Sequence, residues 1–241
     1  MHTPRLGSAD EVKRLLEYVE NGDAHWISRV SASEAAAELI RNAIFRGNLR
    51  PGDQIPFDQI IDAMSVSRLP VREAINVLKH EGLVRVEPHR GSFVGPFNEE
   101  VIREHWTILG LLHGHAAHEV AERGDSTALA RLEEIAGQIV ASRSAAEVGW
   151  LSFEYRRALN LAGGTERLRA IMRPMSHFVP ARLFLDIEAL PEVSRRGASE
   201  VTACIAQREA DEAAMACRRW AAAEGDSVVA YLQMAGVITG S

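Results

Sequence analysis

The chain has 241 residues, of which 46% are hydrophobic and 25% charged, and its formal net charge is −6. This composition excludes the disordered class and fits either one large globular domain or two ordinary ones. Neither a run of about 20 apolar residues nor a signal-peptide core is present, so we expect a cytoplasmic protein without a membrane span.

The distribution of charge along the chain narrows the search for a site. Residues 1–98 carry 12 Lys and Arg against 13 Asp and Glu, whereas the remaining residues carry 15 against 20. Because a polyanion responds to the local field of a surface, the first part is the better place to look for a nucleic-acid site. The only cysteines, Cys204 and Cys217, form no CxxC and no disulfide framework, so we expect reduced thiols.

The chain begins with a predicted arm, residues 1–30, that contains a short amphipathic helix over 10–20. A capped helix follows, with Ser31 or Ser33 as its N-cap and Gly47 as its stop. Two further helices are predicted over residues 57–64 and 67–82.

Two β-prone runs, 83–86 and 92–94, flank a Pro-His-Arg-Gly turn and predict a hairpin. The order of helix, helix, turn, helix and two-stranded wing is typical of a winged helix-turn-helix, which we assign to residues 31–96.

From Asn98 onward the sequence is helical throughout. The predicted helices cover residues 98–123, 126–142, 145–162, 165–189, 192–206 and 208–236. Pro174 and Pro180 must kink or split the fourth of these helices. Repeated breaks by short polar turns predict an antiparallel all-helical bundle over 97–241, and the whole chain is expected to be mainly α.

The third helix carries the strongest sign of function. Helix-turn-helix proteins insert the N-terminal end of this helix into the major groove, where Arg pairs with guanine O6 and N7. Ser67, Arg68 and Arg72 meet that requirement, and the two arginines share one helical face because they are four residues apart. The opposite face is apolar, and the wing tip brings His89, Arg90 and Gly91 toward phosphates or the minor groove.

The run VSRLPVREAINVLKHEGLVRVEPHRGSFV closely resembles the winged helix of GntR-type regulators, over residues 33–96. The family pattern is V-S-R-T-P-V-R-E-A-L, then L-x-x-E-G-L-V, then P-x-R-G-x-x-V. The resemblance implies DNA contacts from the third helix and the wing. Leu69 departs from the usual Thr and could touch a thymine methyl. Asp58 stands where many members carry a DNA-contacting Arg, which would weaken or redirect recognition.

The helical part resembles the FCD branch of this family, in which the bundle senses a small organic acid. The resemblance rests on helix number and on the phrases AAHEVAERGDSTALARLEEI and ALNLAGGTERL. The branch's usual metal ligands align with Ser152, Arg156, Ala198 and Trp220, and none of these is a good ligand. The spacing of His113, His115 and His118 does not place all three on one helical face either. We therefore expect no metal and no other cofactor.

Without a metal, the positive charge for an organic acid would come from Arg156, whose planar fork suits a carboxylate. Ser152 and His113 are expected to face the same cavity. Trp220 either stacks on the ligand or fills the space, and the sequence leaves both open. In the second case the helical domain is closed and the protein regulates without a ligand.

The expected partners are a double-stranded DNA operator, a small organic acid and a second copy of the chain. A homodimer would face two half-sites related by two-fold symmetry. An enzyme is not expected, because the sequence has no P-loop, no Ser/His/Asp arrangement and no paired carboxylates of catalytic spacing.

Overall fold

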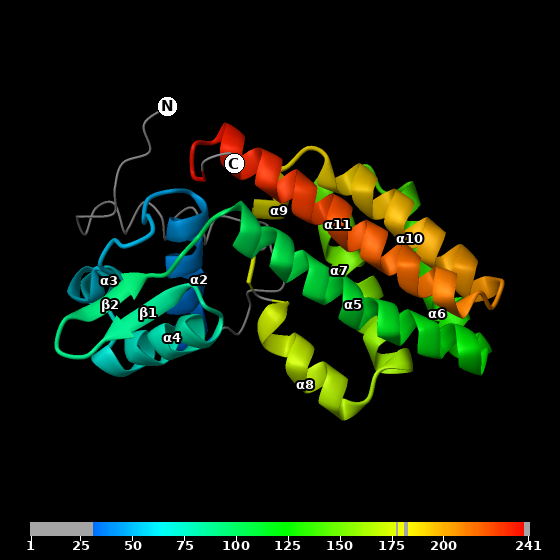
Figure 1. Ribbon diagram of the computed structural model, residues 1–241, viewed down its shortest axis with the longest axis horizontal. Helices are drawn as coiled ribbons and strands as arrows, with labels where there is room; N and C mark the ends of the chain where they lie inside the picture. The colour runs from blue at the N-terminus through cyan, green and yellow to red at the C-terminus, as the bar shows by residue number, and fades with distance from the viewer. Residues whose placement is uncertain (1–30, 177, 181–182, 239–241) are drawn as a thin grey trace. The chain divides into compact units, whose positions relative to one another are not determined.

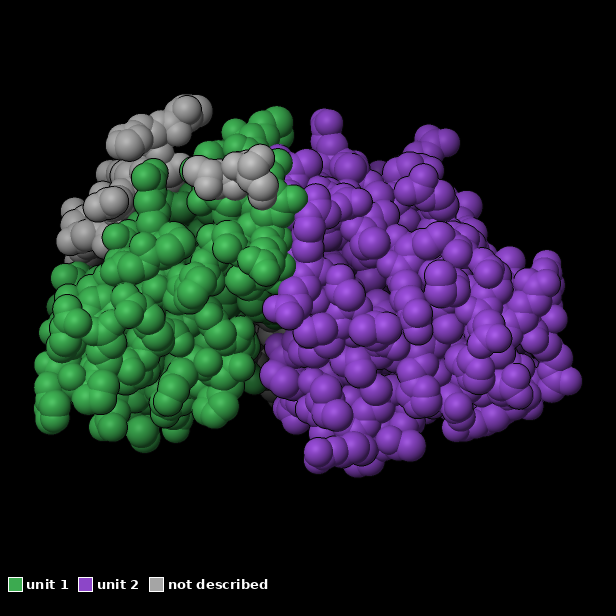
Figure 2. All heavy atoms as spheres, in the orientation of Figure 1, with its two compact units in different colours: residues 1–101, 177–183, 231–241 green, residues 102–176, 184–230 purple. Residues whose placement is uncertain are grey.

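The computed structural model describes residues 31–176, 178–180 and 183–238, and the chain divides into two compact units (Figure 2). The first unit contains the chain up to Val101 with two later pieces, 177–183 and 231–241, and the second contains 102–176 and 184–230. The predicted arm and its helix lie outside the described residues. We predicted a single boundary at residue 96, which assigns everything after it to the helical domain. In the structure, Val237 belongs to the first unit and lies next to Gly47.

The first unit has the predicted winged helix-turn-helix order (Figure 1). Its elements are α2 (Ala32–Phe45), α3 (Phe57–Met64), α4 (Arg68–His80), β1 (Val84–Glu87) and β2 (Gly91–Val94). The two strands are antiparallel, and their register runs from the pair Val84 and Val94 to the pair Glu87 and Gly91. The predicted fold class is therefore confirmed.

Local sequence signals set the ends of these helices. Ser31, and not Ser33, is the N-cap of α2, and it forms a capping box with Glu34. The Glu34 amide donates to Ser31 Oγ at 3.2 Å, and the Ser31 amide donates to Glu34 Oε2 at 2.9 Å. At the end of α3, Ser65 adopts a left-handed conformation with φ 53°, which stops that helix and turns the chain toward α4.

The core of the first unit lies where α4 packs against α2. The face of α4 formed by Val71, Ala74, Ile75 and Leu78 is buried. On α2, residues 39–45 are all buried, and the Phe45 ring packs edge-on against Phe97 with centroids 4.8 Å apart. Burial of a large aliphatic or aromatic side chain stabilises a fold by about 1.5–3 kcal/mol. The burial of one face of α4 therefore fixes which face of this helix points outward.

A buried ion cluster reinforces the contact between α2 and the end of α4. Arg41 donates two hydrogen bonds to the Glu81 carboxylate, at 2.9 and 2.7 Å, and a third to Glu38 at 3.0 Å. Only 5% of the Arg41 side chain and 3% of the Glu81 side chain are exposed. Burial raises the pKa of the Glu38 carboxyl, against the opposing effect of Arg41. Arg41 is thus the cation shared by the buried carboxylate of Glu81 and the partly buried carboxylate of Glu38.

The second unit is built from helices, as predicted. The helices that lie wholly or mostly in this unit are α5 (Glu99–Arg123), α6 (Ser126–Ala141), α7 (Ala145–Gly163), α8 (Glu166–Met175), α9 (Leu183–Asp186), α10 (Leu190–Ala206) and α11 (Ala210–Met234). The predicted helix over 165–189 is two helices, because α8 ends one residue after Pro174 and α9 begins only after Pro180. Among the described residues, we find no helix with both the length and the apolar character that a membrane crossing needs.

Glycines allow the helices of the second unit to approach closely. A Cβ on Gly163 of α7 would overlap the Ala116 carbonyl of α5. A Cβ on Gly114 of α5 would lie 2.8 Å from the Ala214 carbonyl oxygen of α11. Helix α5 therefore packs backbone to backbone against both α7 and α11, and any side chain at these positions would push the helices apart.

We expect Arg41→Ala to lower the free energy of unfolding by about 3–5 kcal/mol, because it leaves the buried Glu81 carboxylate without its cation. The urea midpoint of the full chain measures the change. Lys79→Ala is the control, since Lys79 is exposed on α4 and its removal should cost well under about 1 kcal/mol. Equal midpoints for the two variants would show that the cluster does not stabilise the unit.

Candidate nucleic-acid interface and effector site

The N-terminal end of α4 is an open, basic surface. Ser67 is the N-cap, yet its side chain makes no capping hydrogen bond, and no acidic residue lies in the first turn. The free amides and dipole at such an end favour an anion such as a DNA phosphate. Ser67, Arg68 and Arg72 are all exposed, because the opposite face of the helix is the one buried against α2.

The two arginines of α4 differ in their surroundings. Arg68 Nη2 donates to Asp58 Oδ1 of α3 at 3.1 Å, and the two side chains are 76% and 74% exposed. Arg72 has no ion-pair partner in the described parts of the chain. Leu69, the residue after Arg68, has 63% of its surface exposed, which leaves it available to a thymine methyl.

The wing is held by the segment that precedes α3. Gln54 bridges to Phe93, and Gln54 Nε2 donates to the Arg90 carbonyl at 3.3 Å. His89 and Gly91 have positive φ angles of 62° and 113°, which make the tight turn at the wing tip. Arg90 is 74% exposed in its side chain and pairs with Glu87 at 2.6 Å. The wing thus presents a positioned but accessible cation.

Sequence reasoning missed two charged residues of this surface, Arg85 and Glu87. Arg85 lies over the Phe93 ring at 5.4 Å and pairs with Glu87 at 2.5 Å, so it adds a second cation to the wing. Its sequence signal was the alternation of the strand, which places Arg85 opposite Phe93. The ion pairs of Asp58 with Arg68 and of Glu87 with Arg90 had no signal in the sequence, because each forms only when the chain folds back on itself.

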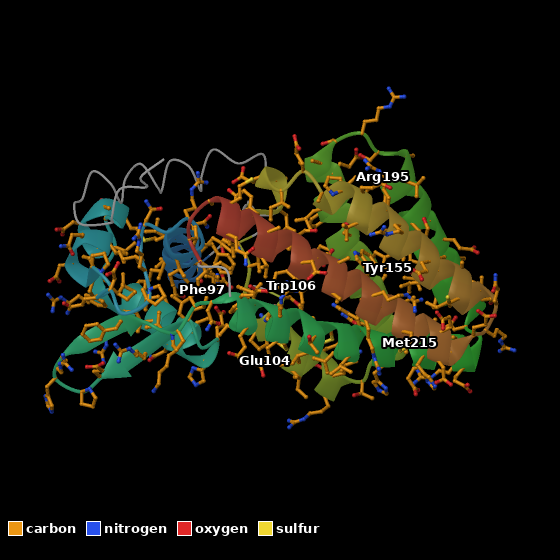
Figure 3. All side chains as sticks on the ribbon, turned by 45° about the horizontal axis from the view of Figure 1, so that its top comes forward. Phe97, Glu104, Trp106, Tyr155, Arg195 and Met215 are labelled. Atoms are coloured by element: carbon orange, nitrogen blue, oxygen red, sulfur yellow. The ribbon has the colours of Figure 1, made fainter. Side chains whose placement is uncertain are left out.

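In the second unit, Arg156 of α7 is not a free cation. It forms an ion pair with Glu224 of α11, and its guanidinium carbon lies 4.4 Å from the centre of the Trp220 ring. Glu224 also accepts a hydrogen bond from Trp106 Nε1 at 3.3 Å. Trp106 and Tyr155, both labelled in Figure 3, come from α5 and α7. Glu224 was missed in the sequence, where it is one acid among many on a predicted surface.

Trp220 fills the interior around Arg156. It is 5% exposed, its ring packs where a Gly197 side chain would be, and it lies 5.6 Å from the Tyr155 ring. Its indole Nε1 is buried and has no acceptor within the described residues. A buried donor without an acceptor is uncommon and calls for a partner. The surroundings of Trp220 therefore fit both a side chain that fills the core and one that contacts a ligand.

Two other predicted effector residues are buried and use their polar atoms internally. Ser152 Oγ donates to the Val148 carbonyl one turn earlier, at 2.7 Å. His113 Nδ1 lies 3.1 Å from Asn160 Oδ1. Burial, assisted by the charge of Arg156, lowers the pKa of His113 to about 3 although the Asn160 contact raises it. His113 is therefore neutral at pH 7.

Two of the positions aligned with the branch's metal ligands, Arg156 and Trp220, are in contact. Ser152 and Arg156 are one turn apart on α7, Trp220 covers Arg156, and Gly197, next to Ala198, lies under the Trp220 ring. In the described residues, no group of three or more His, Cys, Asp or Glu is arranged to hold a metal ion. The absence of a metal stays a prediction from the residue types at these positions.

Known proteins resemble this chain in sequence. The family model described as bacterial regulatory proteins, gntR family, matches residues 32–94. The HTH-type transcriptional regulator Rv0043c of Mycobacterium tuberculosis is 30% identical over 188 residues, which cover 78% of this chain and 77% of that protein. The Nta operon transcriptional regulator of Aminobacter aminovorans is 24% identical over 173 residues, which cover 69% and 80%.

Solved structures show the same fold. A GntR family transcriptional regulator from Pseudomonas syringae pv. tomato superposes with a TM-score of 0.51 at 23% identity, covering 93% of this chain and 95% of its own. McbR/YncC of E. coli superposes with a TM-score of 0.55 at 20% identity, covering 86% and 99%. At these identities the likeness speaks for the fold alone.

We expect acid to destabilise the protein partly through His113. Unfolded histidine takes up a proton below pH about 6.5, whereas folded His113 resists it until about pH 3. The contribution of His113 to the free energy of unfolding is therefore fully present above pH about 6.5. It is lost as the pH falls from about 6.5 to about 3, by up to about 1.4 kcal/mol per pH unit.

The variant His113→Gln should therefore show a shallower loss of stability than the wild type when urea midpoints are compared at pH 7, 6 and 5. His105, whose pKa burial lowers to about 4, remains in both proteins, so only the difference in slope is assigned to His113. Identical slopes would contradict a buried neutral imidazole at this position.

Proposed function

This chain belongs to the gntR family of bacterial regulatory proteins and is a DNA-binding transcription regulator, and on that basis we propose that α4 and the wing bind its operator. The proposed contacts are Ser67, Arg68, Leu69 and Arg72 on the helix and His89, Arg90 and Gly91 on the wing. In this arrangement α4 enters the major groove and the wing follows the backbone or the minor groove.

One observation carries this proposal: α4 buries its apolar face and leaves both arginines outward on the same side. Each arginine has the planar donor fork that matches guanine O6 and N7. A solvated surface helix would equally expose arginines. The proposal therefore also draws on the uncapped N-terminal end of α4 and on the hairpin of the same unit, which presents a second pair of arginines.

We further propose that the protein acts as a homodimer whose two winged helices contact half-sites related by two-fold symmetry. Two-fold dimers of this type read half-sites about one helical turn, or about 10 base pairs, apart. A pseudo-palindrome in DNA selected by the full-length protein is the expected sign.

Replacing Arg68 and Arg72 together by Ala should weaken binding to selected duplex DNA by about 1–3 kcal/mol per arginine. It should also make affinity less dependent on salt, by about one unit of slope for each phosphate that the variant no longer neutralises. Fluorescence anisotropy titrations at several salt concentrations measure both quantities.

The control is the pair Arg131→Ala and Arg157→Ala, which removes two exposed arginines from the second unit. Affinity and salt slope should stay at wild-type values in this variant. Equal behaviour of the two double variants would refute the assignment of α4 as the DNA contact.

For the second unit, we propose membership of the FCD branch and the sensing of a small organic acid beside Arg156 and Trp220. The supporting observation is the buried Trp220 indole N–H, which has no acceptor among the described residues and lies next to a guanidinium. A carboxylate would satisfy the indole and compete with Glu224 for Arg156. Binding would then alter operator affinity if it favours one arrangement of the DNA-binding units.

The alternative is a regulator without a ligand, and the internal pairing of Arg156 with Glu224 favours it. In that case Trp220 fills a closed core, and operator binding is independent of any metabolite. The two functions differ in one measurable property, the response of the protein to carboxylates.

We expect a carboxylate that raises the melting temperature of the wild type to raise it less, or not at all, in Arg156→Ala and in Trp220→Phe. The second variant removes the indole N–H and keeps an aromatic ring. Each shift is measured against the same variant without ligand, so a lower intrinsic stability does not affect the comparison. Arg157→Ala, one residue along on the exposed face, is the control and should respond as the wild type does. No shift with any member of a broad carboxylate panel would select the ligand-independent function.

A further inference from the structure

The contact between Asp58 and Arg68 joins two exposed side chains from different helices. Asp58 lies in the first turn of α3, and Arg68 is the first residue of α4. The Arg68 Nη2 donates to Asp58 Oδ1 at 3.1 Å, although three quarters of each side chain is open to solvent. The carboxylate therefore sits on the same open surface as the arginine proposed to read a base.

This contact does not hold the two helices together. Exposed ion pairs contribute about 0–1 kcal/mol to stability, because solvent screens them and the side chains lose freedom. The helices α3 and α4 are instead fixed by apolar burial, with Ile60 and Val71 both 0% exposed. The consequence of the pair lies in the direction of the guanidinium and in the local charge of the surface.

The chemistry of the guanidinium allows Asp58 and a base to be bound together. Arg has five N–H donors, and a bidentate contact to guanine O6 and N7 uses two of them. The donors that remain can keep their bond to a carboxylate, which holds the plane of the fork in one orientation. A free guanidinium on a flexible stem must instead give up side-chain freedom on binding.

The same carboxylate acts against non-cognate DNA. Brought near a duplex, it faces phosphates of like charge, and the cost is offset only where Arg68 makes its base contact. Arg72, which has no carboxylate partner in the described residues, lacks this restraint. In this arrangement the restrained Arg68 supplies specificity, and the unrestrained Arg72 supplies general affinity for DNA.

We infer that Asp58 is a specificity-determining residue that positions Arg68 for one base pair and penalises duplexes in which that pair is not the cognate one. The inference rests on the proposed binding of DNA by α4. Asp58 makes no contact of its own with a base and acts through Arg68.

The experiment is a double-mutant cycle on DNA discrimination. Duplexes are first selected from a randomised library with the full-length wild type. Affinities for the selected duplex and for each of its single-base-pair variants are then measured at one salt concentration. The variants are Asp58→Ala, Asp58→Asn, Arg68→Ala and the double variant of Asp58→Ala with Arg68→Ala. The control cycle pairs Asp58→Ala with Arg72→Ala.

We expect Asp58→Ala to bind non-cognate duplexes more tightly and to lose discrimination about 5- to 10-fold at one base pair, the lower part of the range for a bidentate base contact. Arg68→Ala should lose discrimination at that same base pair, and adding Asp58→Ala to it should change nothing further there. In the control cycle, the effects of Asp58→Ala and Arg72→Ala should simply add. Asp58→Asn, which keeps the shape but not the charge, should resemble Asp58→Ala.

Two outcomes would overturn the inference: discrimination in Asp58→Ala equal to the wild type at every base pair, or a loss spread evenly over all positions. The second would mark Asp58 as a residue that merely supports α3. These results differ from a failure of the proposed function, in which Arg68→Ala and Arg72→Ala would themselves bind selected DNA as the wild type does.

Discussion

The DNA-binding surface depends on the burial of one face of α4 against α2. Because Val71, Ala74 and Leu78 are fully buried, the helix cannot rotate, and residues on the opposite face must point into solvent. The geometry of an α-helix then determines that Arg68 and Arg72 lie together, one turn apart. A weaker core would leave the same residues present but without a fixed direction, which a contact at a groove floor requires.

Ion pairs in the first unit serve different purposes according to their burial. The cluster of Arg41 with Glu81 is closed to solvent, so it locks the end of α4 to α2 and is costly to break. The pairs of Arg68 with Asp58 and of Arg90 with Glu87 have an exposed arginine, so they contribute little to stability. The buried cluster thus ties α4 to α2, while the pairs on the open surface set the direction and the local charge of their arginines.

The second unit presents the opposite arrangement. The guanidinium at its proposed effector position is paired with Glu224 and covered by Trp220, so its charge is internally compensated. A ligand there must displace a protein contact as well as make its own. This requirement favours a small, strongly acidic group over a neutral metabolite, because only the former replaces the ion pair that is broken.

The order of elements, most helix ends and the outward position of the α4 arginines could be predicted from the amino-acid sequence. These features follow from local rules: caps such as Ser31, breakers such as Pro174, and a 3.6-residue repeat that separates apolar from polar faces. Which charges meet, in contrast, depends on how the chain folds. The partners of Arg41, Arg68 and Arg156 lie 40, 10 and 68 residues away, and no local signal encodes a contact between segments so far apart. For the same reason, the pairing of Arg156 with Glu224 and that of Asp58 with Arg68 could not be predicted from the sequence.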